Sequence, residues 1–232
     1  MKKLLFVCAM FFAIGSSFAD SYSINVFANV DGAASKQIEQ VNSAMKQANI
    51  YSDYKISPFA DSHNVHLTMY LTKYQESQLV NVENTVKVIA ANTSSFSVLS
   101  SGVTLKASDF LMLDVTNTPR LQILTDKLVA SLSKYRDVNT VIPAWAVSYP
   151  ERVQMFQEYG SPNVYEGFDP HFSIFAAKIT SDERGDFDKR VDEVINNLNF
   201  SPTIIQITSL GIGIADENGQ IVKVIKEYSF KK

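Results

Sequence analysis

The 232-residue sequence contains one cysteine, only three histidines and no excess of positive charge. The cysteine, Cys8, lies in an N-terminal segment that we expect to be removed. The mature chain would therefore have no disulfide, no cysteine nucleophile and no cysteine-bound zinc. A formal net charge of −3 provides no electrostatic footprint for long duplex nucleic acid. With 46% apolar residues and few glycines and prolines, the chain is neither disordered nor collagen-like, and it can bury a packed core.

The first nineteen residues have the parts of a secretory signal peptide. Lys2 and Lys3 provide a positive start, residues 4–14 form an almost unbroken apolar run, and Ser17 and Ala19 are small residues at its end. We expect cleavage after Ala19 and export to the periplasm or secretion from the cell. Removal of the two lysines takes the formal charge from −3 to −5.

The alternative, a retained membrane anchor, is disfavoured because the apolar run is too short to span a bilayer well. Cys8 lies inside the run, with no small residue directly before it, which argues against lipoprotein processing. Residues 20–232 contain no later stretch of membrane-spanning length and no flexible linker. We expect one bilobal domain that is monomeric and has no membrane contact after cleavage.

Strands and helices are predicted to alternate along the mature chain. The expected strands are 24–30, 65–71, 96–105, 110–115, 171–179, 203–214 and 221–230. The expected helices are 31–50, 76–91, 119–133, 151–159 and 186–198, and residues 143–170, around the fourth helix, are predicted to be irregular. This order predicts a mixed α+β fold.

The two halves of the chain contain a faint internal repeat. Residues 66–73 and 171–178 both start with His and have a hydroxyl residue two positions on, an aromatic four on and Lys seven on. Each segment is followed by a predicted helix and two strands. Two copies of a strand–helix–strand–strand unit predict two lobes of antiparallel sheet, with a cleft between the equivalent strands as the ligand site.

Side chains two apart on a strand share a face, so His66 pairs with Thr68, and His171 pairs with Ser173. A pseudo-twofold axis between the lobes would make these two pairs face each other across the cleft. A buried, hydrogen-bonded histidine is the structural alternative for either position alone. Burial alone is a poorer explanation for two matching segments that contain two of the three histidines.

This constellation favours phosphodiester chemistry. A neutral imidazole can take a proton from an attacking hydroxyl or water, while a protonated imidazole gives one to the leaving oxygen, without a metal or cofactor. Either His66 or His171 could be the base, depending on the direction of the substrate. Thr68 and Ser173 would donate hydrogen bonds to the non-bridging phosphate oxygens.

The segments Val65-His66-Leu67-Thr68-Met69 and Pro170-His171-Phe172-Ser173-Ile174 resemble the twin motifs of the 2H phosphoesterase superfamily. This superfamily includes bacterial RNA 2′,3′-cyclic phosphodiesterases and 2′-5′ RNA ligase-like proteins. The resemblance implies a bilobal fold with a central cleft and metal-independent hydrolysis of 2′,3′-cyclic phosphates, 2′-5′ linkages or similar esters of nucleotides and short RNA. It also implies the acid–base and phosphate-binding roles stated above for the motif residues.

Five further residues lie near the motifs or in the irregular segment. Tyr70 and Phe175, predicted on the same faces as the motif histidines, either stack a base or close the end of the cleft. Tyr149 and Arg152 lie in the irregular segment, where a substrate loop would lie. Arg152 either offsets phosphate charge or is a solvated surface residue. His63, three positions before His66, would face away from the site in a continuous strand.

The leading hypothesis is therefore an exported phosphodiesterase with a histidine acid–base pair. An alternative from another class is a non-catalytic envelope protein that binds a nucleotide or phosphate ester in the same cleft. A weaker third hypothesis is a secreted factor that acts on 2′-5′ oligonucleotides or cyclic dinucleotides.

Overall fold

The computed structural model describes residues 20–231, and the predicted signal peptide lies outside the described residues. The strands are β1 (Ser21–Val30), β2 (Leu67–Gln75), β3 (Phe96–Leu105), β4 (Phe110–Val115), β5 (His171–Ala176), β6 (Ile204–Ala215) and β7 (Ile221–Ser229). The α-helices are α1 (Gly32–Gln47), α2 (Ile50–Asp53), α3 (Leu79–Ala91), α4 (Pro119–Leu132), α5 (Pro150–Tyr159) and α6 (Arg184–Asn197). The predicted α+β class is confirmed.

The strands form one seven-stranded sheet in the order β2-β1-β6-β3-β4-β5, with β7 also paired to β6. Every strand pair in this sheet is antiparallel. The sheet is open, and the strands at the two ends of the order, β2 and β5, curl toward each other and come into contact. These two edge strands belong to the two histidine motifs.

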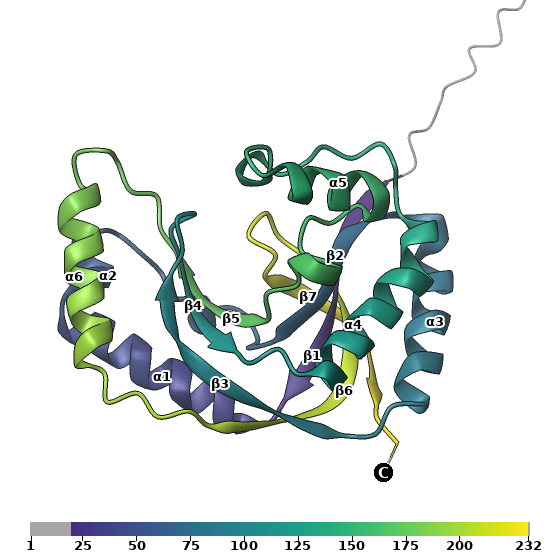
Figure 1. The fold of residues 1–232 in the computed structure, drawn as a ribbon, viewed down its shortest axis with the longest axis horizontal. Coiled ribbons are helices and arrows are strands. Elements are labelled where there is room, and N and C mark those ends of the chain that lie inside the picture. The colour runs from purple at the N-terminus through teal and green to yellow at the C-terminus, as the bar shows by residue number, and fades with distance from the viewer. Residues whose placement is uncertain (1–19, 232) are drawn as a thin grey trace, which may run out of the picture.

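Helices cover the sheet in two groups (Figure 1). Helices α3 and α4 pack on the part formed by β2, β1, β6 and β7, whereas α1, α2 and α6 lie by β3, β4 and β5. Each lobe thus combines the motif strand and helix of one sequence repeat with the strand hairpin of the other. The prediction of one lobe per repeat is corrected, because hydrophobic periodicity determines which face of a strand is buried but not which strand lies next to it.

Local sequence explains where several elements begin. The Asp31 side chain caps α1 by accepting a hydrogen bond from the backbone N–H of Ala33. Pro119 opens α4 at a position where a missing N–H costs little, and the Thr118 side chain caps that helix. The predicted helix 31–50 is divided into α1 and α2 because Asn49 adopts a positive φ of 58° between them.

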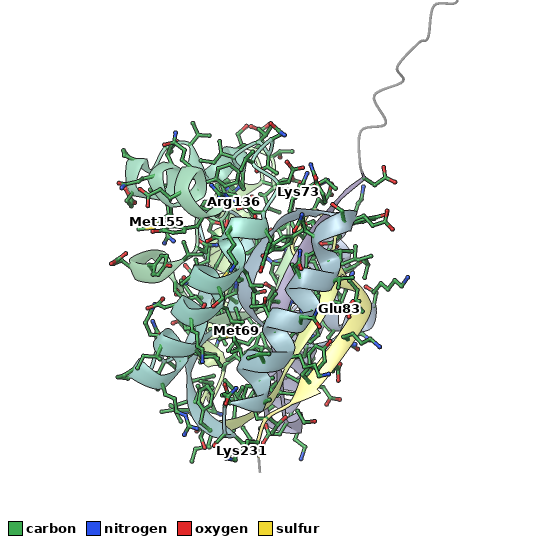
Figure 2. The ribbon with its side chains drawn as sticks, turned by 90° about the vertical axis from the view of Figure 1, so that its right-hand side faces the viewer. Met69, Lys73, Glu83, Arg136, Met155 and Lys231 are labelled. Carbon is green, nitrogen blue, oxygen red and sulfur yellow. The ribbon has the colours of Figure 1, made fainter. Side chains whose placement is uncertain are left out.

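The irregular segment before the second motif docks on β2. The Tyr70 hydroxyl donates to the carbonyl of Tyr159, and the Thr72 hydroxyl donates to the carbonyl of Gly160. Before this segment, the backbone N–H of Asp137 donates to the carbonyl of Lys73. Figure 2 shows Lys73 and Arg136 at the same end of the molecule. No helix in residues 20–231 is long and apolar enough to span a membrane.

Candidate active site

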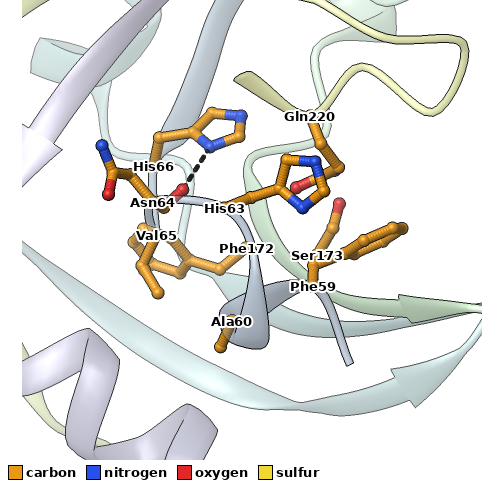
Figure 3. Close-up of a pocket in the computed structure, with 9 residues that line it drawn as sticks. All are labelled: Phe59, Ala60, His63, Asn64, Val65, His66, Phe172, Ser173 and Gln220. Atoms are coloured by element: carbon orange, nitrogen blue, oxygen red, sulfur yellow. Dashed lines mark hydrogen bonds between the residues drawn. The ribbon is translucent and has the colours of Figure 1, made fainter. Parts of the chain in front are cut away.

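The two motif histidines have the same local geometry. The strand β2 begins at Leu67 and not at position 65 as predicted, so His66 lies directly before the strand. His171 is the first residue of β5, as predicted. The His66 Nδ1 lies 2.9 Å from the carbonyl of Asn64, and the His171 Nδ1 lies 2.6 Å from the carbonyl of Asp169 (Figure 3 for His66). A carbonyl requires a donor, which assigns the proton to Nδ1 and leaves Nε2 of each neutral ring as a base.

Burial lowers the pKa of both imidazoles. His66 is only 7% exposed, and the positive charge of nearby His171 lowers its pKa further, while the carbonyl of Asn64 partly opposes the shift. Burial also lowers the pKa of His171, against the opposing effect of the Asp169 carbonyl and carboxylate. Both rings are therefore mainly neutral at pH 7 before an anionic ligand arrives.

Asn25 of β1 organises the first motif. It is fully buried, and its Nδ2 donates to the Thr68 hydroxyl oxygen at 2.8 Å and to the Gly219 carbonyl at 3.0 Å. The same nitrogen lies 3.3 Å from Nε2 of His66. Because the Thr68 oxygen accepts from Asn25, its own O–H remains available as a donor to a phosphate oxygen.

The second motif contributes Ser173 to a pocket that also contains His66 (Figure 3). The pocket is lined by Phe59, Ala60, His63, Asn64, Val65, His66, Phe172, Ser173 and Gln220. The structure thus brings together His66 and Ser173, which are 107 positions apart in the sequence. Their roles in binding or catalysis remain predictions.

His63 also lines this pocket, in contrast to the expectation that it faces away from the site. The expectation assumed a continuous strand, but residues 59–61 form a 3₁₀ turn. The backbone N–H groups of Ser62 and His63 both donate to the carbonyl of Phe59. This turn folds the chain back, so His63 and His66 reach the same pocket.

A charged cluster lies beside His171. The Lys106 ammonium is 3.1 Å from the Asp114 carboxylate and 3.4 Å from that of Asp169. Asp114 is the register partner of His171 in the β4–β5 pair. The second motif thus has a cation nearby, although two carboxylates already neutralise it.

Tyr70 and Phe175 are inside the core and not on the exposed face. Tyr70 is 1% exposed, and Phe175 is fully buried with edge-to-face contacts to Tyr51 and Phe187. A register shift in the β4–β5 pair changes the alternation before Phe175, so that Ile174 and Phe175 are both buried. Neither ring has a free face on which a base could stack.

Arg152 stabilises the loop before the second motif through hydrogen bonds. Its guanidinium donates to the carbonyls of Pro162 and Gly167 and to the side chain of Asn163. It is therefore neither a solvated surface residue nor a free cation for a phosphate. Tyr149 is 48% exposed at the start of α5.

The sequence pattern does not point to Asn25, Lys106 or Asp216, and the Asp216 carboxylate lies 3.6 Å from Nε2 of His63. Asn25 had a weak signal, a single polar amide between Ile24 and Val26 in an apolar strand. The other two had none, because their proximity to the histidines depends on the folding of distant turns. In residues 20–231, no group of three or more His, Cys, Asp or Glu side chains is arranged to hold a metal ion.

No protein-family model matches the sequence, and no curated protein matches it. Several solved structures match its fold. E. coli LigT in complex with 3′-AMP has 11% identity and a TM-score of 0.50, over 92% of this chain and 100% of that chain. A phosphoesterase has 9% identity and a TM-score of 0.48, over 92% and 100%, and Kluyveromyces marxianus Usb1 has 13% and 0.44, over 90% and 97%.

The likeness to LigT covers nearly the whole of both chains. The twin motifs independently predicted a bilobal fold of the same kind. The chain therefore has the fold of E. coli LigT, a 2H phosphoesterase.

Proposed function

We propose that the protein is an exported, monomeric, metal-independent phosphodiesterase of the 2H type, acting in the periplasm or outside the cell. Its substrates are small nucleotides or short RNA with a 2′,3′-cyclic phosphate or a 2′-5′ linkage. The nucleotide class is supported by the fold shared with E. coli LigT, which was solved with 3′-AMP. Export is supported by the sequence of residues 1–19.

The observation that carries the proposal is the matched pair of imidazoles. His66 and His171 come from equivalent sequence motifs, and in each ring Nδ1 contacts the carbonyl two residues earlier. His171 is close enough to His66 for its charge to lower the pKa of His66. This leaves two Nε2 atoms as the groups that can exchange protons.

In hydrolysis of a 2′,3′-cyclic phosphate, one neutral imidazole takes a proton from water, whose oxygen forms a bond to phosphorus. The bond from phosphorus to one ribose oxygen breaks, and the second imidazole, in its protonated form, gives its proton to that oxygen. The products are a phosphomonoester and a free hydroxyl. Thr68 and Ser173 donate hydrogen bonds to the non-bridging oxygens, where negative charge increases in the transition state.

The test is hydrolysis of 2′,3′-cyclic nucleotides, 2′-5′ and 3′-5′ dinucleotides and cyclic dinucleotides in the presence of EDTA. We expect turnover of at least one member and a loss of about a hundredfold or more in His66→Ala and in His171→Ala. Lys73→Ala changes an exposed residue of the same repeat and serves as the control. Full activity in both folded histidine variants would refute the proposed pair.

A second candidate function is binding without turnover. The observation in its favour is the near-complete burial of His66, whose Nε2 faces the Asn25 amide. Binding of a cyclic nucleotide that is weakened by Thr68→Ala and Ser173→Ala, with no hydrolysis of any panel member, would support this function over the enzyme.

A further inference from the structure

The two motifs differ in what holds the residue two positions before each histidine. Asn64 and Asp169 each provide a backbone carbonyl to Nδ1 of the histidine that follows. Asn64 is exposed, whereas the Asp169 carboxylate lies 3.4 Å from the Lys106 ammonium. The carbonyl that orients His171 therefore belongs to a residue whose side chain is paired with another part of the sheet.

Lys106 is itself fixed in place. It directly follows β3, and its backbone N–H donates to the carbonyl of Phe110 at 2.8 Å. Its side chain is 29% exposed, and the ammonium also lies 3.1 Å from one oxygen of the Asp114 carboxylate. The other oxygen of Asp114 accepts from the Thr104 hydroxyl. These contacts restrict the position of the ammonium, which gives the Asp169 carboxylate a fixed partner.

The β4–β5 pair places these contacts next to the second motif histidine. Asp114 is the register partner of His171. The N–H of the next residue, Val115, donates to the Pro170 carbonyl at 3.0 Å. Strand β4 lies between β3 and β5 in the sheet (Figure 1). The chain before His171 is thus held by a backbone hydrogen bond from β4 and, at the Asp169 side chain, by the ion pair.

The position of Lys106 favours an indirect role over direct binding of the phosphate. It is not among the described residues that line the pocket of His66 and Ser173. Its ammonium already lies beside two carboxylates, and a bound phosphate would have to compete with both of them. The contacts of Lys106 therefore lead to the His171 ring and not to the phosphate.

We propose that Lys106 is a positioning residue of the active site, which orients the His171 ring through its ion pair with Asp169. The ion pair fixes the residue whose carbonyl accepts the Nδ1 proton, and this hydrogen bond leaves Nε2 as the atom that exchanges protons. The inference deepens the proposed function and rests on it for the reaction in which His171 takes part.

The same charges also act on His171 electrostatically. The Lys106 ammonium lowers the pKa of this ring, whereas the carboxylates of Asp169 and Asp114 raise it. A further titratable group near the ring is His66, directly before β2. Loss of either partner of the Lys106–Asp169 pair should therefore shift the pKa of His171, in opposite directions for the two partners.

Imidazole NMR of Lys106→Met tests the inference without any need for turnover. Methionine retains a long side chain and removes the charge. We expect the titration midpoint of His171 to rise. In alkaline solution, where the rings are neutral, the imidazole nitrogen shifts should show less of the Nδ1–H tautomer in His171 than in the unaltered protein. His66 is the internal control and should retain its tautomer. An unchanged midpoint and tautomer of His171 in the folded variant would overturn the inference.

Asp169→Asn retains the backbone carbonyl and removes the carboxylate. It should lower the titration midpoint of His171, the opposite of Lys106→Met, and reduce the same tautomer. A common loss of the tautomer with opposite shifts of the midpoint separates the orientation of the ring from its charge. Lys106→Arg retains the cation and should keep both properties close to those of the unaltered protein.

In the hydrolysis assay, we expect Lys106→Met to lower kcat about threefold to tenfold and to change KM by less than about twofold. The double variant Lys106→Met with Asp169→Asn should lose little more than either single variant, because both changes break one contact. Lys189→Met is the matched control and should retain the full rate, since it removes a lysine paired with Glu193 on the surface of α6.

Two kinetic results would contradict the inference. A rise in KM with kcat unchanged would show that Lys106 binds the substrate directly. Losses in kcat that simply multiply in the double variant would show that Lys106 does not act through Asp169.

These outcomes are separable from those of the proposed function. Hydrolysis of a cyclic nucleotide, with the His171 midpoint and tautomer unchanged in Lys106→Met, would refute the inference alone. The expected changes of midpoint and tautomer in a protein that hydrolyses no member of the panel would refute the proposed catalysis alone.

Discussion

Desolvation governs the site at the scale of single residues. His66 and Asn25 are polar side chains placed among apolar neighbours, and Asn25 retains a buried side-chain oxygen without a hydrogen-bond partner. Burying a group in this way stabilises its neutral form and makes its few hydrogen bonds energetically important. The electrostatic behaviour of the site therefore depends on a small number of named contacts.

The first prediction concerns stability and pH. Both His66 and His171 have a pKa below the unfolded value of about 6.5, so the unfolded chain binds more protons in acid. The free energy of unfolding should therefore decrease as the pH falls below about 6.5. The decrease should end once the pH is below the folded-state pKa of both histidines. Urea unfolding between pH 8 and 5 measures this decrease, and it should be smaller in His66→Gln and His171→Gln. An unchanged slope in both variants would contradict the assignment.

The second prediction concerns Asn25. Asn25→Asp places a carboxylate beside His66 and should raise the pKa of His66, because the negative charge favours the imidazolium. The His66 imidazole NMR signal measures the shift directly, and the acid limb of the rate profile should move to higher pH with it. Asn29→Asp makes the same charge change further along β1, where the side chain contacts Ser209, and should leave the His66 pKa much closer to its original value.

At the scale of elements, two neighbouring strands control the position of the His66 ring. Phe27 of β1 packs edge-on against His66, with ring centroids 5.8 Å apart, and lies over Gly211 of β6. A Cβ atom at Gly211 would overlap the Phe27 ring. Glycine at this position thus allows the close approach that places Phe27 against the histidine.

The third prediction follows from this contact. Gly211→Ala should displace Phe27 toward His66, destabilise the fold by about 1–3 kcal/mol and lower the turnover rate by roughly tenfold to a hundredfold. Gly102→Ala, in β3, is the control because its added methyl group meets no atom within 4 Å. Thermal unfolding and steady-state rates measure both effects, and equal behaviour of the two variants would refute the argument.

At the scale of the whole molecule, one sheet runs through both lobes. β6 pairs with β1 and β7 over one part of its length and with β3 at its start, and β3 continues into the second lobe. A single cluster of buried apolar side chains extends through the described residues. Because neither lobe has a sheet or a core of its own, we expect the lobes to depend on each other for stability.

The fourth prediction is a single unfolding transition. Circular dichroism should coincide with tyrosine and tryptophan fluorescence during denaturation, as in a two-state domain. The histidine NMR signals from the two lobes should be lost at the same denaturant concentration. Two separate transitions would show that the lobes are independent domains, contrary to the expectation of one domain.

The local sequence predicted most of the elements and suggested the motif pairs. Residues 96–105 and 110–115 were predicted as strands with the bounds that the structure has, because period-two alternation depends only on neighbouring residues. The pairing of His66 with Thr68 and of His171 with Ser173 was predicted from the same short-range pattern, and the structure brings His66 and Ser173 to one pocket. The twin motifs also indicated the fold.

Only the tertiary structure decided what surrounds those motifs. The Asn25 amide meets the Gly219 carbonyl across 194 positions of sequence, and His63 meets Asp216 through a turn that the strand pattern did not indicate. The burial of Tyr70 and Phe175 and the exchange of hairpins between the repeats likewise depend on long-range strand pairing. Periodicity describes the environment of a side chain along its own element, whereas the partners of that side chain are set by contacts between distant segments.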